Sequence, residues 1–173
     1  MSDIAPEDQG TDNVSESRLL EAYIQKPEKI SFYQKGLEKM QQAGAFGYKW
    51  HWSWWAFFFG WAFLLYRKAY LPALGAFAFT VVLSFIPVFG ILIAMIALGG
   101  SSSYFILKRY NDLKNTLKGT EEERIQAMYS FGGFHTWVVW AAAIFYTLTF
   151  LSIIASLVFI GSMSSGVSSP YGY

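Results

Sequence analysis

Three long apolar runs dominate the pattern of hydrophobic and polar positions along this chain. Asp, Glu, Lys and Arg are absent from residues 50–66, 69–107 and 125–173. A helix of about 20 apolar residues crosses the hydrocarbon core of a bilayer. The pattern therefore predicts an all-α integral membrane protein with helices in each of the three runs.

The second run, 69–107, is too long for one crossing. As a single helix it would measure about 58 Å, roughly twice the hydrocarbon thickness. Pro87 and Gly90 lie near its middle, and proline removes a backbone donor and clashes with the preceding turn. We expect a helix break at Pro87 and Gly90, which divides the run into a hairpin with arms at about 71–85 and 88–107.

The first and last runs differ in length. Residues 52–66 would form only about 22 Å of helix, and Gly60 stands at the centre, so we expect a re-entrant or short first membrane helix. Residues 134–160 are long enough for one C-terminal transmembrane helix, with Trp137 and Trp140 as an aromatic anchor near one end.

The polar part of the sequence predicts further helices. Residues 1–17 are acidic and carry almost nothing apolar, which is typical of a disordered tail. Ser17 could cap a short helix, and Pro27 suits the first position of a second one. In the second helix Ile30, Tyr33, Leu37 and Met40 form one apolar stripe. This amphipathic helix either packs on its neighbours or lies on the lipid headgroups.

Residues 108–124 form a polar stretch between the last two runs. Gly119 ends one helix there, and Thr120 with Glu123 has the capping-box pattern that begins another. The expected division of the chain is a disordered acidic tail (1–17), cytoplasmic or interfacial amphipathic helices (18–49), a membrane domain (50–110), a polar cytoplasmic loop and helix (111–133), a transmembrane helix (134–162) and a flexible tail (163–173).

The cations predict an orientation. They fall into three groups, at 18–49, 67–68 and 108–124, and Lys and Arg prefer the cytoplasmic side. All three groups share that side only if each of the first two apolar runs returns to the side it left and the last run crosses once, with the C-terminal tail outside. The rival arrangement is three plain crossings, at 52–66, about 75–98 and 137–160.

The stretch FYQKGLEKMQQAGAFGYKWHWSWWAFFFGWAFLLYRKAYLPAL, together with a weaker echo at SSSYFILKRY, resembles the DUF2628 family of small bacterial membrane proteins over about residues 30–115. The chain departs from the family pattern at Ser53, Trp55 and Trp61, where Asn, Ala and Pro are usual. Losing that proline weakens the case for a forced break beside Gly60. The family has no established activity, so the resemblance implies membrane residence and no chemistry.

We interpret the central part of this stretch as a membrane-interface motif. Trp and Tyr prefer the headgroup level of a bilayer, and Arg67 and Lys68 could meet lipid phosphates. On a continuous helix Trp54, Phe58 and Leu65 would share one face with Trp61. The motif residues are Trp52, Trp54, Phe57, Phe58, Phe59, Gly60, Leu65, Tyr66, Arg67, Lys68 and Tyr70.

Composition agrees with a membrane location and excludes several classes of partner and site. The chain is 54% hydrophobic and 14% charged, whereas soluble domains average about 25% charged. A net charge of +1 gives no basic field for nucleic acid. Cysteine is absent, which excludes disulfides, thiol nucleophiles and thiolate metal sites.

The sequence offers no catalytic, cofactor-binding or metal-binding residues. It lacks the nucleotide-binding and hydrolase motifs, and its apolar runs lack the charged groups that proton relays and coupled transporters use. We interpret His51 and His135 as interfacial polar residues, residues 99–103 (GGSSS) as the flexible end of a membrane helix, and residues 121–123 as a solvated helix cap.

These observations favour a non-enzymatic integral protein of the bacterial inner membrane that acts as a scaffold, anchor or accessory subunit. Its partners would be the lipid bilayer and either another membrane protein or further copies of the chain. The alternative is a passive channel or transport component, in which a homo-oligomer lines a path with hydroxyl groups from Thr80, Ser84, Thr147, Thr149 and Ser152.

Overall fold

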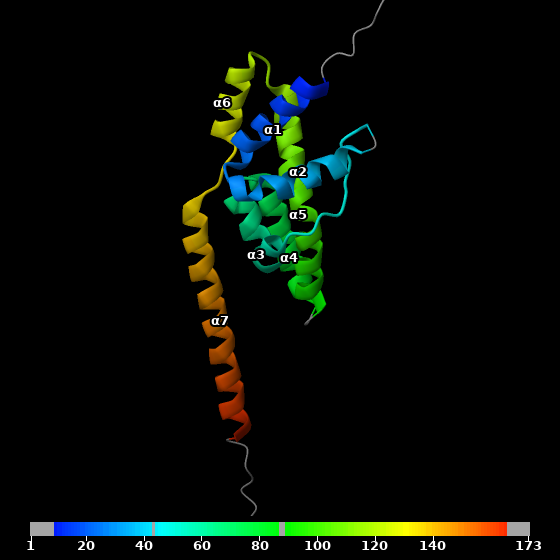
Figure 1. Cartoon of the computed structure of the whole chain (residues 1–173). Coiled ribbons are helices and arrows are strands. Elements are labelled where there is room, and N and C mark those ends of the chain that lie inside the picture. Colours follow the sequence, from blue (N-terminus) through cyan, green and yellow to red (C-terminus); the bar gives the residue numbers. More distant parts are fainter. Residues whose placement is uncertain (1–8, 43, 87–88, 166–173) are drawn as a thin grey trace, which may run out of the picture. The chain divides into compact units, whose positions relative to one another are not determined.

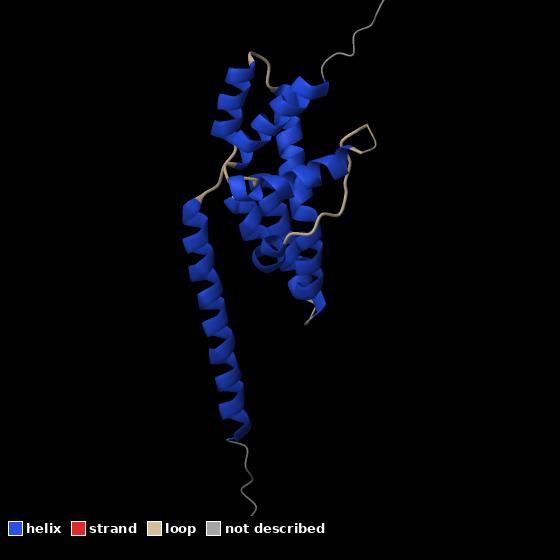
Figure 2. Ribbon diagram, viewed as in Figure 1, coloured by secondary structure: helices blue, strands red, loops and turns tan. Residues whose placement is uncertain are grey.

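The computed structural model describes residues 9–42, 44–86 and 89–165, and over these residues it is all-helical, without strands (Figures 1 and 2). This confirms the all-α part of the predicted fold class. The helices are α1 (Gln9–Ile24), α2 (Pro27–Gln41), α3 (Trp54–Tyr66), α4 (Tyr70–Ser84), α5 (Phe89–Thr116), α6 (Glu121–Phe131) and α7 (Thr136–Ser165). The chain divides into two units, Met1–His135 and Thr136–Tyr173.

The long helix α5 is the central element of the first unit. Helices α3 and α4 pack on it and on each other, while α2 packs across it and α1 packs on α2 and α6 (Figure 1). We call α1, α2, α6 and residues 107–116 of α5 the cap, and α3, α4 and residues 89–106 of α5 the body. All the charged side chains of α5 lie in the cap.

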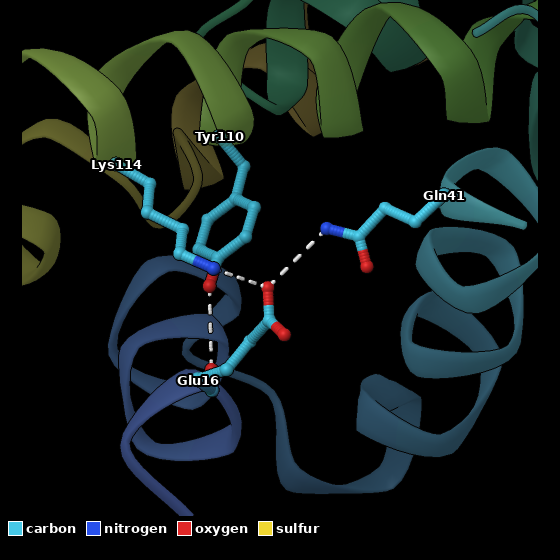
Figure 3. Close-up of polar contacts among 4 residues, drawn as sticks. All are labelled: Glu16, Gln41, Tyr110 and Lys114. Carbon is cyan, nitrogen blue, oxygen red and sulfur yellow. Dashed lines mark hydrogen bonds and ion pairs between the residues drawn. The ribbon is translucent and has the colours of Figure 1, made fainter. Parts of the chain in front are cut away.

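A polar cluster fastens α1 to the rest of the cap (Figure 3). The Glu16 carboxylate lies 2.6 Å from the Lys114 ammonium and accepts a bond from Gln41, and the Glu16 carbonyl accepts one from the Tyr110 hydroxyl at 3.2 Å. The structure has residues 9–17 as the first half of α1, so the predicted tail is wrong there. Within this stretch Glu16 is held by partners on α2 and α5 that are distant in sequence; residues 1–8 lie outside the described residues.

Helix α3 is short and breaks at its centre, as expected from the sequence. Gly60 has φ 48° and ψ −119°, a backbone conformation that is essentially restricted to glycine. The break therefore forms without the proline that the family pattern has at position 61. The chain enters α3 beside Gly99 and leaves it beside Arg109. A β-carbon on Gly60 would lie only 3.2 Å from Leu98, so the break lies beside α5, and the second arm returns toward the cap.

Helices α4 and α5 form the predicted hairpin, and Pro87 lies outside the described residues. Gly90, however, is inside α5 and does not break it. A β-carbon there would collide with the Leu83 carbonyl oxygen, so this glycine allows the two arms to approach closely. Helix α5 continues past the hairpin arm, which we expected to end at about residue 107, to Thr116. It therefore ends close to Gly119, where the sequence predicts the end of a helix.

Helices α6 and α7 are both helical where the sequence predicts a helix. The Thr120 hydroxyl accepts a bond from the Glu123 backbone N–H, and the Glu123 carboxylate accepts one from the Thr120 N–H, which confirms the capping box. Helix α7 covers most of the predicted C-terminal run and extends past it to Ser165.

Candidate functional site

The turn between α3 and α4 carries the Tyr66-Arg67-Lys68 part of the motif. Lys68 has a left-handed backbone, with φ 58°. Its N–H bonds to the Leu65 carbonyl and the Ala69 N–H to the Leu64 carbonyl, which is the Schellman arrangement that ends a helix. Because glycine is the usual residue at this position, the sequence carries no sign of the turn at Lys68.

Arg67 is buried, with 5% of its surface exposed. Its guanidinium donates to the Ile24 carbonyl at 2.9 Å and lies 5.1 Å from the centre of the Tyr33 ring. Ile24 is the last residue of α1, where the helix dipole favours a cation. The structure thus corrects the expectation that Arg67 meets lipid phosphates, because its charge is used inside the protein to join α1, α2 and α3.

Arg109 reinforces the turn from the side of α5. It donates to the Lys68 carbonyl and, at 3.4 Å, to the carbonyl of Phe131. Among the described residues, neither Arg109 nor Arg67 forms a salt bridge with a carboxylate. Both arginines therefore act as donors to backbone carbonyls at the ends of helices.

Residues 132–135, which follow α6, dock on the same turn. The Gly133 N–H donates to the Tyr23 carbonyl at 2.7 Å, and the His135 N–H donates to the Tyr66 carbonyl at 2.9 Å. The Tyr70 hydroxyl is 2.5 Å from His135 Nε2. In addition, the Tyr66 ring stacks on Phe134, and the Lys26 ammonium lies over both rings. The turn therefore fixes the point from which the chain leaves the first unit.

Burial sets the electrostatics of the aromatic groups around Arg67. Burial raises the pKa of Tyr23 to about 12, and the charges of Arg109 and Arg67 only partly oppose it. Burial likewise raises the pKa of Tyr33, against the opposing effect of Arg67. Both phenols are therefore neutral at physiological pH, and neither is prepared to act as a base.

A second part of the motif crosses the middle of α5. The backbone N–H of His51 donates to the Gly100 carbonyl and that of Ser53 to the Gly99 carbonyl, while the indole rings of Trp50 and Trp52 cover the two glycines. Gly99 and Gly100 are buried within α5, so the predicted flexible helix end is wrong. The signal that could have found this contact is the Gly-Gly pair, whose missing side chains leave room for indole rings.

His51 lies in this crossing segment. Its ring is 4.3 Å from that of Phe32, and its Nε2 is buried without a hydrogen-bond partner. Burial lowers the pKa of His51, and the nearby Lys39 charge lowers it further. The imidazole is thus held neutral, packed against Phe32 of α2.

The aromatic residues of the motif lie at different depths of the structure. Trp54 and Phe58 are 63% and 60% exposed, whereas Trp61, on the other side of the break at Gly60, packs edge-on against Phe77. Since α3 is broken, the single face expected for Trp54, Phe58, Trp61 and Leu65 does not exist. Trp55 and Phe59 are also exposed, and Phe57 packs on Trp52.

Of the hydroxyl groups that the sequence suggested could line a channel, three have described hydrogen bonds. Thr80, Ser84 and Thr149 each donate to a carbonyl of their own helix. Within the described part of the chain, no group of three or more His, Asp or Glu side chains could hold a metal ion.

These features define a helical protein in which two helical stretches are long and apolar enough to cross a membrane, by length and composition: α5, and residues 121–163, which contain most of α7. The chain belongs to the DUF2628 family, described as a protein of unknown function, whose pattern matches residues 11–109. The matched range begins nearer the N-terminus than the resemblance noted in the sequence. It therefore includes most of α1, together with the Arg67 turn and the crossing segment (residues 44–53). No curated protein and no solved structure matches the chain.

Proposed function

We propose that this protein is a non-enzymatic integral protein of the bacterial inner membrane, which presents its cap to a partner as a scaffold, anchor or accessory subunit. The observation that carries the proposal is the separation of the first unit into two surfaces. The body exposes large apolar side chains along α3, α4 and α5 and has no charged side chain between Ala69 and Leu107, whereas charged side chains cover the cap.

The exposed apolar surface is far larger than a water-soluble monomer tolerates. It includes Trp54 on α3, Leu71 on α4 and Ile96 on α5. A hydrocarbon solvent removes the cost of exposing these side chains. The cap, in contrast, is held by the ion pairs Glu16–Lys114 and Arg18–Glu121, which suit an aqueous surface.

The arrangement around Arg67 supports a structural role for the family motif. The Arg67 guanidinium is engaged by the Ile24 carbonyl and the Tyr33 ring, so it supports packing between helices and is not placed to act on a substrate. A rigid cap whose outer face carries exposed charges, such as Lys35 and Glu38 on α2, is a surface on which a partner can dock.

Charge reversal on α2 tests this function. The full chain carrying Lys35→Glu and Glu38→Lys should remain in the membrane after alkaline carbonate extraction, because neither residue contributes to the body. It should also lose the membrane partner that cross-linking and purification recover reproducibly with the unmodified chain. The control is Lys118→Glu, an exposed reversal beyond α5, which should keep that partner. Release of the unmodified chain by carbonate, or recovery of the same partner with all variants, would contradict the proposal.

A further inference from the structure

The crossing segment, residues 44–53, shows how far from the cap the water-exposed groups extend along α5. Residues 44–53 are not helical, Lys49 is exposed, and the segment bonds to α5 at Gly99 and Gly100. Irregular backbone is not found against lipid in the hydrocarbon region, and an ammonium group there is costly. The hydrocarbon region therefore begins no closer to the cap than the level of Gly99.

The body is short below that level. From Gly99 back to Phe89, where α5 begins, the helix measures about 15 Å at 1.5 Å per residue. The hydrocarbon core is about 30 Å thick. The α4–α5 hairpin thus reaches through one half of the core and does not reach the opposite surface.

The described residues at the tip of the α4–α5 hairpin are large and apolar, unlike those of a loop that lies in water. Phe85 and Phe89 are 83% and 69% exposed, and Ile86 is also exposed. The two arms are held together directly above them, since the Gly90 backbone lies against the Leu83 carbonyl. Large apolar side chains therefore stand at the far end of the first unit, where no other described part of that unit covers them.

We propose that the α4–α5 hairpin, with the broken helix α3 beside it, is inserted in one leaflet only, and that its tip lies near the midplane of the bilayer against lipid acyl chains. The inference rests on the proposed membrane location and goes beyond it. The contrast is α7, which is about 45 Å long as a helix and has no charged side chain, so it has the length for a full crossing.

Acyl chains fit this surface better than a second copy of the protein does. Ile91, Leu92 and Ile93 are all exposed, and consecutive residues point about 100° apart around a helix. On α4, Leu71 and Val82 are exposed as well. A partner helix covers a narrower stripe, whereas fluid hydrocarbon surrounds the whole of such a surface.

Cysteine variants of the full chain test the depth of the tip, because the natural sequence has no cysteine. We would place single cysteines at the tip (Ser84→Cys, and Ile86→Cys as a second position), on the cap (Ser130→Cys) and near the end of α7 (Ser162→Cys). After reconstitution into phosphatidylcholine–phosphatidylglycerol vesicles, each would be labelled with an environment-sensitive fluorophore. Quenching would be measured with aqueous iodide and with lipids that carry a nitroxide near the headgroup or near the chain end.

The expected result is that the label at position 84 or 86 loses most emission to the chain-end nitroxide, less to the headgroup nitroxide and almost none to iodide. The label at position 130 should be quenched by iodide. If an impermeant maleimide labels Ser84→Cys from the side opposite to the one that labels Ser130→Cys, the hairpin crosses and the inference is overturned. Strong iodide quenching at both tip positions, or protection from every quencher with formation of a disulfide-linked dimer, would overturn it equally.

The same variants separate this inference from the proposed function. If Ser162→Cys reacts from the same side as Ser130→Cys, α7 does not cross, and the depth of the tip is still read from positions 84 and 86. If the unmodified chain is released by carbonate, the membrane location itself fails.

Discussion

At the scale of single residues, Arg67 looks like a lipid-contacting cation in the sequence, but in the structure it joins helices inside the protein. A cation that follows an apolar run reads as an interface residue, and we interpreted it so from the sequence. In the structure the guanidinium caps the C-terminal end of α1 at Ile24 and lies over Tyr33. No periodicity could have shown this, because Ile24 is 43 residues away and Tyr33 belongs to yet another helix.

Replacing Arg67 should therefore weaken the cap. In Arg67→Met the Ile24 carbonyl loses its buried donor, and we expect the free energy of unfolding to fall by about 1–3 kcal/mol. The measurement is denaturant unfolding in detergent, followed by near-ultraviolet circular dichroism. Lys35→Met removes the same charge from an exposed position and should change stability little. Equal stability of the two variants would show that the Arg67 contacts contribute nothing.

At the scale of elements, the sequence located the helices and most of their ends, and it failed at the start of α1. Charge-free runs located α3, α4, α5 and α7, and the capping box located α6. The start of α1 was wrong because packing determines it: Glu16 is held by Lys114 and Tyr110, and these three residues show no pattern in sequence. The function of Gly90 was also misread, since close approach of two helices and a helix break both call for glycine.

The break in α3 gives a prediction about this element. Gly60→Ala places a β-carbon at a backbone conformation with φ 48° and close to Leu98, so we expect a loss of about 1–3 kcal/mol in stability. Gly75→Ala is the matched control, because Gly75 is inside α4 and a β-carbon there meets nothing within 4 Å. It should be neutral or stabilise by up to about 1 kcal/mol. Both would be measured by unfolding in the same detergent, and a tolerated Gly60→Ala would mean that α3 can straighten.

At the scale of the whole molecule, the charge pattern predicted which groups of cations share a side of the membrane. That sidedness stays a prediction, and the fold of the first unit brings the same groups together. The groups at 18–49, 67–68 and 108–124 all belong to the cap or to the segments that border it. The sequence could not show how deep the body extends from this surface. That depth follows from one contact between distant segments, the bond of Ser53 to the Gly99 carbonyl.

The position of the break at Gly60 has a mechanical consequence. The chain enters α3 beside Gly99, breaks beside Leu98 and leaves α3 beside Arg109. The described contacts of α3 with α5 therefore lie well above the tip, and the body narrows there to the two helices α4 and α5. Inserted as proposed, it adds area to one monolayer and very little to the other, so a dense population of chains should bend the membrane with the cap on the convex side. Reconstituted vesicles should then shrink in diameter as the protein-to-lipid ratio rises when caps face outward, and cryo-electron microscopy would measure this. A diameter independent of that ratio would show that the taper exerts no bending force.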